Sequence, residues 1–366
     1  MLNRRMLKNL DYTLIFAVMS LLLISLVIIS SATHVTTATE EPYRFLERQA
    51  GFTVVNTLLV IFLLTVDYNA LAKYAGVFYW LSVISLLAVR FVGQTALGAQ
   101  RWIQIGPVTL LPSEFAKIII IITLAKMLEN RKLETVRDLV PVALHVGLPF
   151  ILILLQPDLG TSLVFIAITL GMVYMAGIRT GLLAGIFASG LALLPIFWHF
   201  MHDYQKKRLL VFIDPNVDPL GSGYHIIQSK IAIGSGMLFG KGLFAGTQSQ
   251  LNFLPENHTD FIFAVIGEEL GFIGAAIILL LYFIVIYRGI KIAGEARDNF
   301  GTLLATGVTS MLLFHVLVNV GMTAGIMPVT GIPLPFMSYG VSALTKSMVG
   351  VAILLNVYMR RQKIMF

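Results

Sequence analysis

The 366-residue sequence contains no cysteine. This absence excludes a disulfide framework, a thiol nucleophile and a zinc site built on cysteine ligands. Charge is also scarce, because Asp, Glu, Lys and Arg make up only 12% of the residues, against about a quarter in soluble domains. Hydrophobic residues reach 57%. A soluble domain cannot bury that much apolar surface, whereas a lipid bilayer can.

Linkers and basic tracts are lacking too. No Pro/Ser-rich linker, low-complexity segment or internal repeat divides the chain, so we predict a single membrane domain over residues 1–366. The formal net charge is +7, but the basic residues lie between apolar runs instead of clustering on one tract. That pattern is typical of membrane proteins, so we expect membrane lipid and no nucleic acid among the partners.

The apolar runs predict an all-α, polytopic membrane protein with about ten transmembrane helices. The first run follows Arg4, Arg5 and Lys8 as in a signal peptide. From Tyr12 to Ser31, however, it is long enough to cross a bilayer, and we interpret it as a retained helix. The predicted spans are 11–31, 50–66, 74–92, 114–128, 138–155, 161–178, 181–200, 260–288, 301–325 and 338–358.

The basic residues predict the orientation of these spans. With the N-terminus in the cytoplasm, most Lys and Arg of the short connections lie inside, and the short outer loops hold only Arg44, Arg48 and Arg101. We therefore predict that both termini are cytoplasmic. Residues 202–259, between helices 7 and 8, form a long outer loop whose Ile, Leu, Phe and Gly content indicates order. Within this large extracytoplasmic loop, the helical spacing over 224–233 predicts an amphipathic helix at the interface.

Ionisable residues inside predicted spans are costly in lipid and mark candidate sites. Glu114 and Lys117 are three residues apart on one helix face, so this spacing allows a purely structural ion pair as readily as a functional role. Lys346 is predicted at the depth of Glu268 and Glu269. We expect these three to be structural intramembrane charges, with Lys346 paired to one of the carboxylates. The alternatives are a water-filled cavity or loss of the lysine proton.

Asp260, at the start of the eighth predicted span, has two interpretations. Its carboxylate is suited to capping the helix N-terminus. At the membrane rim it is equally suited to act as a general base, because partial desolvation raises a carboxyl pKa toward the working pH. Asp158 is predicted to cap the sixth span, and His258 alone is typical of an interfacial polar residue. No P-loop, Ser-His-Asp triad or metal-ligand spacing is recognisable.

Distinctive motifs follow one another along the chain: QRW at 100–102, PSEFAK at 112–117, QPDLGT at 156–161, YHIIQSKIAIGSG at 224–236, GTQSQL at 246–251, FLPE at 253–256, HTDFIF at 258–263, GIPLP at 331–335 and SYG at 338–340. Together they resemble the SEDS family (shape, elongation, division, sporulation). The stretch GTQSQ at 246–250 is similar to the elongation, or rod-shape-determining, branch of that family and less so to the division branch. Two positions depart from the family pattern: Val341 stands where a second glycine is common, and Lys346 stands where related sequences are usually uncharged.

This resemblance implies a peptidoglycan glycosyltransferase. It would polymerise lipid II at the outer face of the bacterial cytoplasmic membrane during elongation and release undecaprenyl diphosphate. The implied partners are a class B penicillin-binding protein (a transpeptidase) and elongation-complex proteins such as MreC and MreD. Asp260 matches the aspartate to which the family's base role is assigned. The positions of Trp102, Glu114 and Lys117 are also important in the family.

Our mechanistic hypothesis is an inverting hexosyl transfer in which Asp260 accepts the proton of the acceptor hydroxyl. Lys117 and Arg101 are the candidate cations for the leaving diphosphate. Glu114, Glu256 and His258 are further substrate-binding candidates, and Trp102 is either an interfacial anchor or a ring facing a sugar. The metal site is unknown, and a divalent cation (Mg or Mn) is a possible cofactor. The alternatives are a lipid II flippase or transporter and a non-catalytic scaffold.

Overall fold

The computed structural model describes residues 8–34, 43–96, 99–106, 108–201, 203–218 and 221–361. Ten long helices lie on the ten predicted spans, and eight of the described helices are long and apolar enough to cross a membrane. The chain is therefore a polytopic, almost entirely α-helical membrane protein. The ten helices are α2 (Tyr12–Thr33), α3 (Arg44–Thr65), α5 (Ala75–Val92), α6 (Pro112–Leu128), α7 (Val136–Leu154), α8 (Leu159–Met175), α9 (Thr180–Phe200), α13 (Ile262–Gly294), α14 (Asn299–Thr323) and α15 (Val341–Met359).

Helix α2 belongs to the core of the bundle. Leu14, Leu21 and Ile28 recur at helical spacing and are fully buried. The Ser31 hydroxyl donates a hydrogen bond of 2.6 Å to Glu269 on α13. A helix packed in this way is part of the folded protein, as the interpretation of a retained helix requires.

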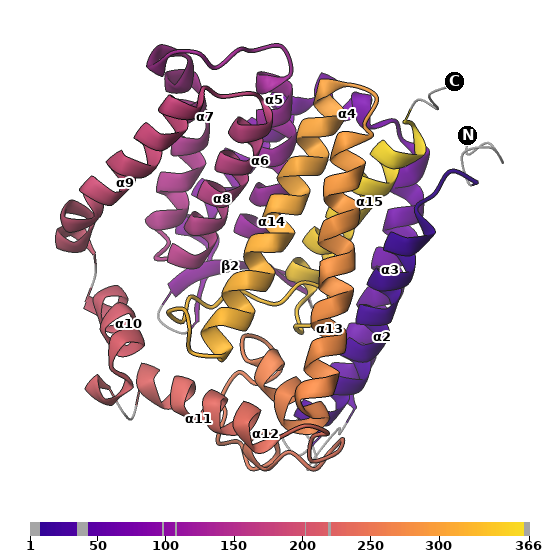
Figure 1. Ribbon diagram of the computed structural model, residues 1–366, viewed down its shortest axis with the longest axis vertical. Helices are drawn as coiled ribbons and strands as arrows, with labels where there is room; N and C mark the ends of the chain where they lie inside the picture. Colours follow the sequence, from indigo (N-terminus) through magenta and orange to yellow (C-terminus); the bar gives the residue numbers. More distant parts are fainter. Residues whose placement is uncertain are drawn as a thin grey trace.

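The ends of the first and last described helices lie at the same end of the bundle (Figure 1). Asp11, just before α2, pairs with Arg288 of α13 at 2.6 Å, and the Arg288 guanidinium lies over the ring of Tyr358 on α15. This arrangement agrees with an even number of crossings. The short helix α4 (Tyr68–Lys73) lies at this end as well.

A small antiparallel sheet precedes α6 and was not predicted. Its strands are β1 (Gln94–Ala96), β2 (Ala99–Ile105) and β3 (Val108–Leu110), in the order β1-β2-β3. Gly106, at a φ of 60°, makes the turn between β2 and β3. The sheet lies within the outer segment 93–113 and carries Arg101 and Trp102 on β2.

The loop 202–259 folds over the opposite end of the bundle as α10 (Asp203–Ile213), the 3-10 turn η1 (Pro215–Val217), α11 (Ser222–Ser235) and α12 (Thr247–Gln250) (Figure 1). The predicted helix over 224–233 is confirmed as α11. Its buried face carries Ile226, Ser229 and Ala232, and Ile231 remains 45% exposed. The small residues let α11 approach α13 closely, because a Cβ at Gly236 would lie 1.9 Å from the Gly267 carbonyl oxygen.

Helix α13 is interrupted at Gly271, which has a φ of 65°. The interruption frees backbone groups that the loop before α12 satisfies. The Phe272 amide donates to the Met237 carbonyl (2.9 Å), and the Lys241 amide donates to the Glu268 carbonyl (3.0 Å). The outer loop is therefore hydrogen-bonded directly to the outer part of α13.

The predicted pairing of Lys346 with Glu268 or Glu269 is wrong. The Lys346 ammonium lies 2.8 Å from the Glu114 carboxylate, and Glu268 pairs instead with Lys241 at 2.8 Å. Counting residues from the start of a helix estimates only depth, and depth alone does not identify the partner. Contact depends on which helices are neighbours and how each is rotated about its axis. Here α15 presents Lys346 to α6.

Candidate active site

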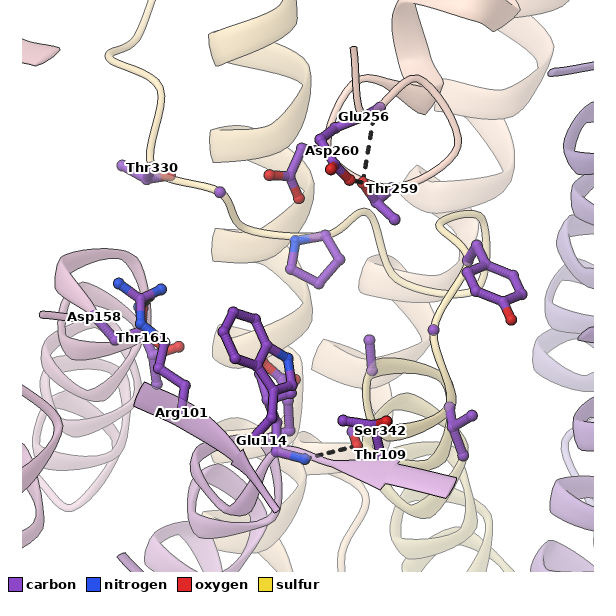
Figure 2. Close-up of a pocket in the computed structure, with 18 of the residues that line it drawn as sticks. Arg101, Thr109, Glu114, Asp158, Thr161, Glu256, Thr259, Asp260, Thr330 and Ser342 are labelled. Carbon is purple, nitrogen blue, oxygen red and sulfur yellow. Dashed lines mark hydrogen bonds and ion pairs between the residues drawn. The ribbon is translucent and has the colours of Figure 1, made fainter. Parts of the chain in front are cut away.

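A cavity of about 960 Å³ lies at the end of the bundle that the outer loop covers (Figure 2). Its wall combines the start of α3, strands β2 and β3, the starts of α6, α8 and α15, helix α10, the turn before α13 and the loop between α14 and α15. The chemically important lining residues are Arg48, Arg101, Trp102, Glu114, Asp158, Lys207, Arg208, Glu256, Asp260 and Tyr339. Segments from nearly the whole length of the chain therefore meet at one polar site.

Asp260 lies in the turn before α13 and does not cap that helix. The cap position belongs to Phe261, with no side-chain hydrogen bond. Within the described part of the chain, no group donates a hydrogen bond to the Asp260 carboxylate, which lines the cavity (Figure 2). Its oxygens are therefore available to a ligand.

Burial raises the pKa of the Asp260 carboxyl to about 6. The negative charges of Glu256 and Asp158 also raise it, and the positive charges of Arg208 and Arg101 lower it. A carboxylate of this pKa is mostly ionised at neutral pH and is a stronger base than an exposed aspartate. The site therefore holds a group suited to accepting a proton.

The backbone of Asp260 is held by Asn319 of α14, a residue that the sequence analysis did not identify. The fully buried Asn319 amide donates to the carbonyl of Asp260 (2.9 Å) and to that of Ile332 (2.8 Å). Ser338 adds a second tie, because its hydroxyl donates to the Thr259 carbonyl (2.6 Å). The turn before α13 and the loop between α14 and α15 are thus joined by the Asn319 amide, by the Ser338 hydroxyl and by a backbone hydrogen bond from Tyr339 to His258 (2.9 Å).

We expect Asn319→Ala to lower the activity of the site by about tenfold, because two buried carbonyls lose their donor, at roughly 1–3 kcal/mol each, and the Asp260 turn loosens. The matched control is Asn356→Ala. Asn356 also donates to two carbonyls, those of Leu63 (2.8 Å) and Val66 (2.7 Å). It lies near the last residue of α15, at the end of that helix away from the cavity. The reaction rate and the melting temperature are measured together. Equal activity losses in the two variants would contradict a local role for Asn319.

Arg101 and Asp158 stabilise the turn before α8. The Arg101 guanidinium donates to the carbonyls of Gln156 (3.0 Å) and Pro157 and lies 3.8 Å from the Asp158 carboxylate. Asp158 accepts a hydrogen bond from the Thr161 amide (3.1 Å), which confirms it as the cap of α8. Both side chains line the cavity as well, so they combine a structural role with a charged surface.

Glu114 is the floor of the cavity and belongs to a buried ionic cluster. The Lys117 ammonium lies 2.5 Å from one carboxylate oxygen, and the Lys346 ammonium lies 2.8 Å from the other. His315 of α14 lies 2.8 Å from the Lys346 ammonium and 3.4 Å from that of Lys117. The ion pair that the three-residue spacing allows is therefore present. Lys117 is 1% exposed and is not part of the cavity wall.

Two other predicted site residues lie in the turn that precedes Asp260. Glu256 lines the cavity and accepts a hydrogen bond from the Thr259 hydroxyl (2.8 Å) (Figure 2). His258 is not part of the wall. Its ring packs against Phe45 and Tyr339, and burial lowers its pKa. His258 thus packs against neighbouring aromatic rings and does not face the cavity.

The described residues offer no recognisable site for a bound metal ion. In the ranges that the structure describes, no three His, Asp or Glu side chains come together in a way that could hold a metal. Asp260, Glu256 and Asp158 all line the cavity, but they do not form such a group. We therefore derive no step through a divalent cation.

Comparison with known proteins identifies the family. A family model described as "Cell cycle protein" and named for FtsW, RodA and SpoVE matches residues 12–363. The chain belongs to this family, the SEDS family. It is 40% identical over 363 residues to the peptidoglycan glycosyltransferase MrdB of Escherichia coli K12, covering 97% of this chain and 95% of that protein. It is 38% identical to the stage V sporulation protein E of Bacillus subtilis, covering 95% of this chain and 96% of that protein.

Solved structures of SEDS proteins share the fold. The rod-shape-determining protein RodA of Thermus thermophilus is 30% identical, with a TM-score of 0.72 over 97% of this chain and 98% of that one. A chain of a peptidoglycan synthase complex, described as coordinating polymerization and crosslinking, is 32% identical, with a TM-score of 0.82 over 95% of this chain and 97% of that one. The expected resemblance to the elongation branch is confirmed.

The two positions that we expect to depart from the SEDS pattern lie in the cavity wall or in the cluster behind it. Val341 is the first residue of α15 and lines the cavity. Lys346 lies further along α15, in the ionic cluster with Glu114. Neither departure interrupts the helix. Five further residues of the cavity wall or its support could not be recognised from the sequence, because isolated basic and polar residues carry no motif before the fold brings them together: Arg48, Lys207, Arg208, His315 and Asn319.

Proposed function

We infer that this SEDS protein is a peptidoglycan glycosyltransferase and propose that Asp260 is its general base. The observation that carries the proposal is the environment of the Asp260 carboxylate. It lines a large cavity, accepts no hydrogen bond from the described residues and has a pKa raised to about 6. The names of the relatives supply the reaction class. Lipid II, with its sugars in water and its tail in lipid, suits a cavity at the end of a membrane bundle.

In the proposed reaction, the acceptor sugar hydroxyl gives its proton to Asp260 and attacks the anomeric carbon of the donor. The bond from that carbon to the diphosphate breaks with inversion, and undecaprenyl diphosphate leaves. Negative charge develops on the leaving group, and fixed cations stabilise it. Arg48, Arg101 and Arg208 line the cavity, and their planar guanidinium groups match phosphate oxygens. Lys117 contributes only through Glu114.

The orientation of the protein follows from charge. The basic residues of the short connections gather at the end of the bundle that is opposite the cavity, the end where Asp11 meets Arg288. By the positive-inside rule, that end is cytoplasmic. We therefore place the cavity at the outer face of the bacterial cytoplasmic membrane. The proposed partners are a class B penicillin-binding protein, which crosslinks the product, and elongation-complex proteins such as MreC and MreD.

The test is glycan synthesis by the purified protein in detergent with lipid II. Polymer formation supports the glycosyltransferase. A lipid II flippase or a scaffold makes none, because detergent removes the two sides of the membrane and neither function forms a glycosidic bond. Absence of polymer with folded protein, both alone and with its penicillin-binding partner, would contradict the proposal.

The raised pKa of Asp260 predicts the pH dependence of the reaction. The base acts as the carboxylate, so activity is expected to fall as the pH drops through about 6. Glu256→Gln removes a negative charge that raises this pKa, so the acid limb should move to lower pH. Arg208→Gln removes a positive charge that lowers it, so the limb should move to higher pH. The value of kcat/KM is measured against pH. Shifts of the same sign in both variants would exclude Asp260 as the group that titrates.

A further inference from the structure

The cluster beneath the cavity contains more positive than negative charge. Glu114 offers one carboxylate, and each of its oxygens faces a lysine ammonium: Lys117 at 2.5 Å and Lys346 at 2.8 Å. Both lysines are 1% exposed and Glu114 is 4% exposed. Among the described residues, no other acidic side chain forms an ion pair with either lysine. One carboxylate is therefore the only ion-pair partner, among the described residues, of two buried lysines.

His315 does not supply the missing negative charge. Its Nδ1 lies 2.8 Å from the carbonyl oxygen of Met311, so Nδ1 carries the hydrogen of the neutral ring. The other nitrogen, Nε2, is then an acceptor, and it faces the Lys346 and Lys117 ammonium groups. A neutral histidine placed in this way accepts hydrogen bonds from the lysines without changing the net charge. With both lysines protonated, the cluster carries one surplus positive charge.

Only Glu114 of this cluster reaches the cavity wall. Lys346 therefore makes no direct contact with a ligand in the cavity, and it acts there by holding Glu114 and by its charge at a distance. With Lys117 alone, the carboxylate would be balanced and held by one contact. Lys346, which comes from a different helix, holds the second oxygen and makes the floor of the cavity net positive. An uncompensated buried charge is unfavourable until a counterion arrives.

We propose that Lys346 is a positioning residue that strengthens binding of the anionic diphosphate of the lipid-linked substrate and product. It holds the second oxygen of Glu114 and gives the cavity floor its positive charge. The proposal rests on the glycosyltransferase function, because that function supplies the diphosphate. One unit charge at about 10 Å and an effective dielectric constant of about 20 to 40 corresponds to roughly a four- to fifteenfold change in affinity.

The test is Lys346→Met, which preserves the approximate length and removes the charge. We expect the KM for lipid II to rise roughly four- to fifteenfold, with kcat changed less than about twofold. We also expect the affinity for undecaprenyl diphosphate, measured as its ability to raise the melting temperature, to fall by the same factor. The melting temperature without ligand should not fall, because the Glu114–Lys117 pair remains balanced. The control is Lys126→Met, which removes an exposed lysine from the far end of α6.

Two further variants complete the test. Lys346→Gln guards against misfolding, since its amide is still a hydrogen-bond donor, and it should raise KM as Lys346→Met does. Lys346→Arg keeps the charge and should retain a near-normal KM. A lower melting temperature with unchanged KM and unchanged diphosphate affinity would make Lys346 purely structural and overturn the proposal. The ligand-binding measurement needs no polymerisation, so it separates this proposal from the glycosyltransferase assignment. If the wild-type protein makes no polymer but Lys346→Met still weakens diphosphate binding, the glycosyltransferase assignment is contradicted and the proposal for Lys346 is not.

Discussion

Asp260→Asn is expected to abolish glycan polymerisation by the purified protein while leaving it folded and inserted in the membrane. The change removes the proton acceptor and keeps the size of the side chain. Because Asp260 caps no helix and accepts no hydrogen bond from the described residues, the fold does not depend on its charge. Loss of a positioned general base costs about 10²–10⁴ in rate. The measurement is the initial rate of polymer formation from lipid II, together with the melting temperature.

The matched control is Asp298→Asn. Asp298 caps α14, accepting from the Gly301 amide at 2.7 Å, and asparagine caps a helix nearly as well as aspartate. It lies at the end of the bundle opposite the cavity, so this variant should polymerise lipid II normally. Polymer yields from Asp260→Asn protein that match those of Asp298→Asn would remove Asp260 from the role of base.

The second large effect is expected from exchanging Glu114 and Lys117. A simple structural pair would tolerate Glu114→Lys combined with Lys117→Glu. Here a lysine at position 114 would face the ammonium of Lys346, which lies 2.8 Å from the present carboxylate. Disrupting a buried ion pair in this way costs about 3–5 kcal/mol. We expect the activity and the melting temperature of the exchanged protein to fall at least as far as those of either single variant.

The control for this exchange lies on the same helix. Lys126 and Glu129 form a pair at the same spacing, 2.6 Å apart, but the Lys126 side chain is 46% exposed. Exposed pairs contribute about 0–1 kcal/mol, so exchanging these two residues should leave stability and activity nearly unchanged. Recovery of polymerisation in the Glu114/Lys117 exchange would mean that the pair acts alone and that Lys346 is not coupled to it.

The sequence by itself determined the membrane architecture and the reaction class. Spans such as α2 and α14 are visible because hydrophobicity is a local property, and the bilayer imposes their length. Asp260 was identifiable because it belongs to a distinctive motif. Its two interpretations, as a cap or as a base, could not be separated, because capping depends on the backbone of the turn. The structure places Phe261 and not Asp260 at the cap position, which favours the interpretation of Asp260 as a base.

Only the tertiary structure decided which polar groups meet. Lys346 was assigned to the wrong carboxylate, since its partner depends on the rotation of α15 toward α6. His315 and Asn319 were not recognised at all, because each acts through contacts with residues distant in the sequence. Hydrophobicity along the sequence indicates which segments are apolar enough to span the membrane. The choice of neighbours follows from packing between side chains of different helices, and no local pattern in the sequence records it.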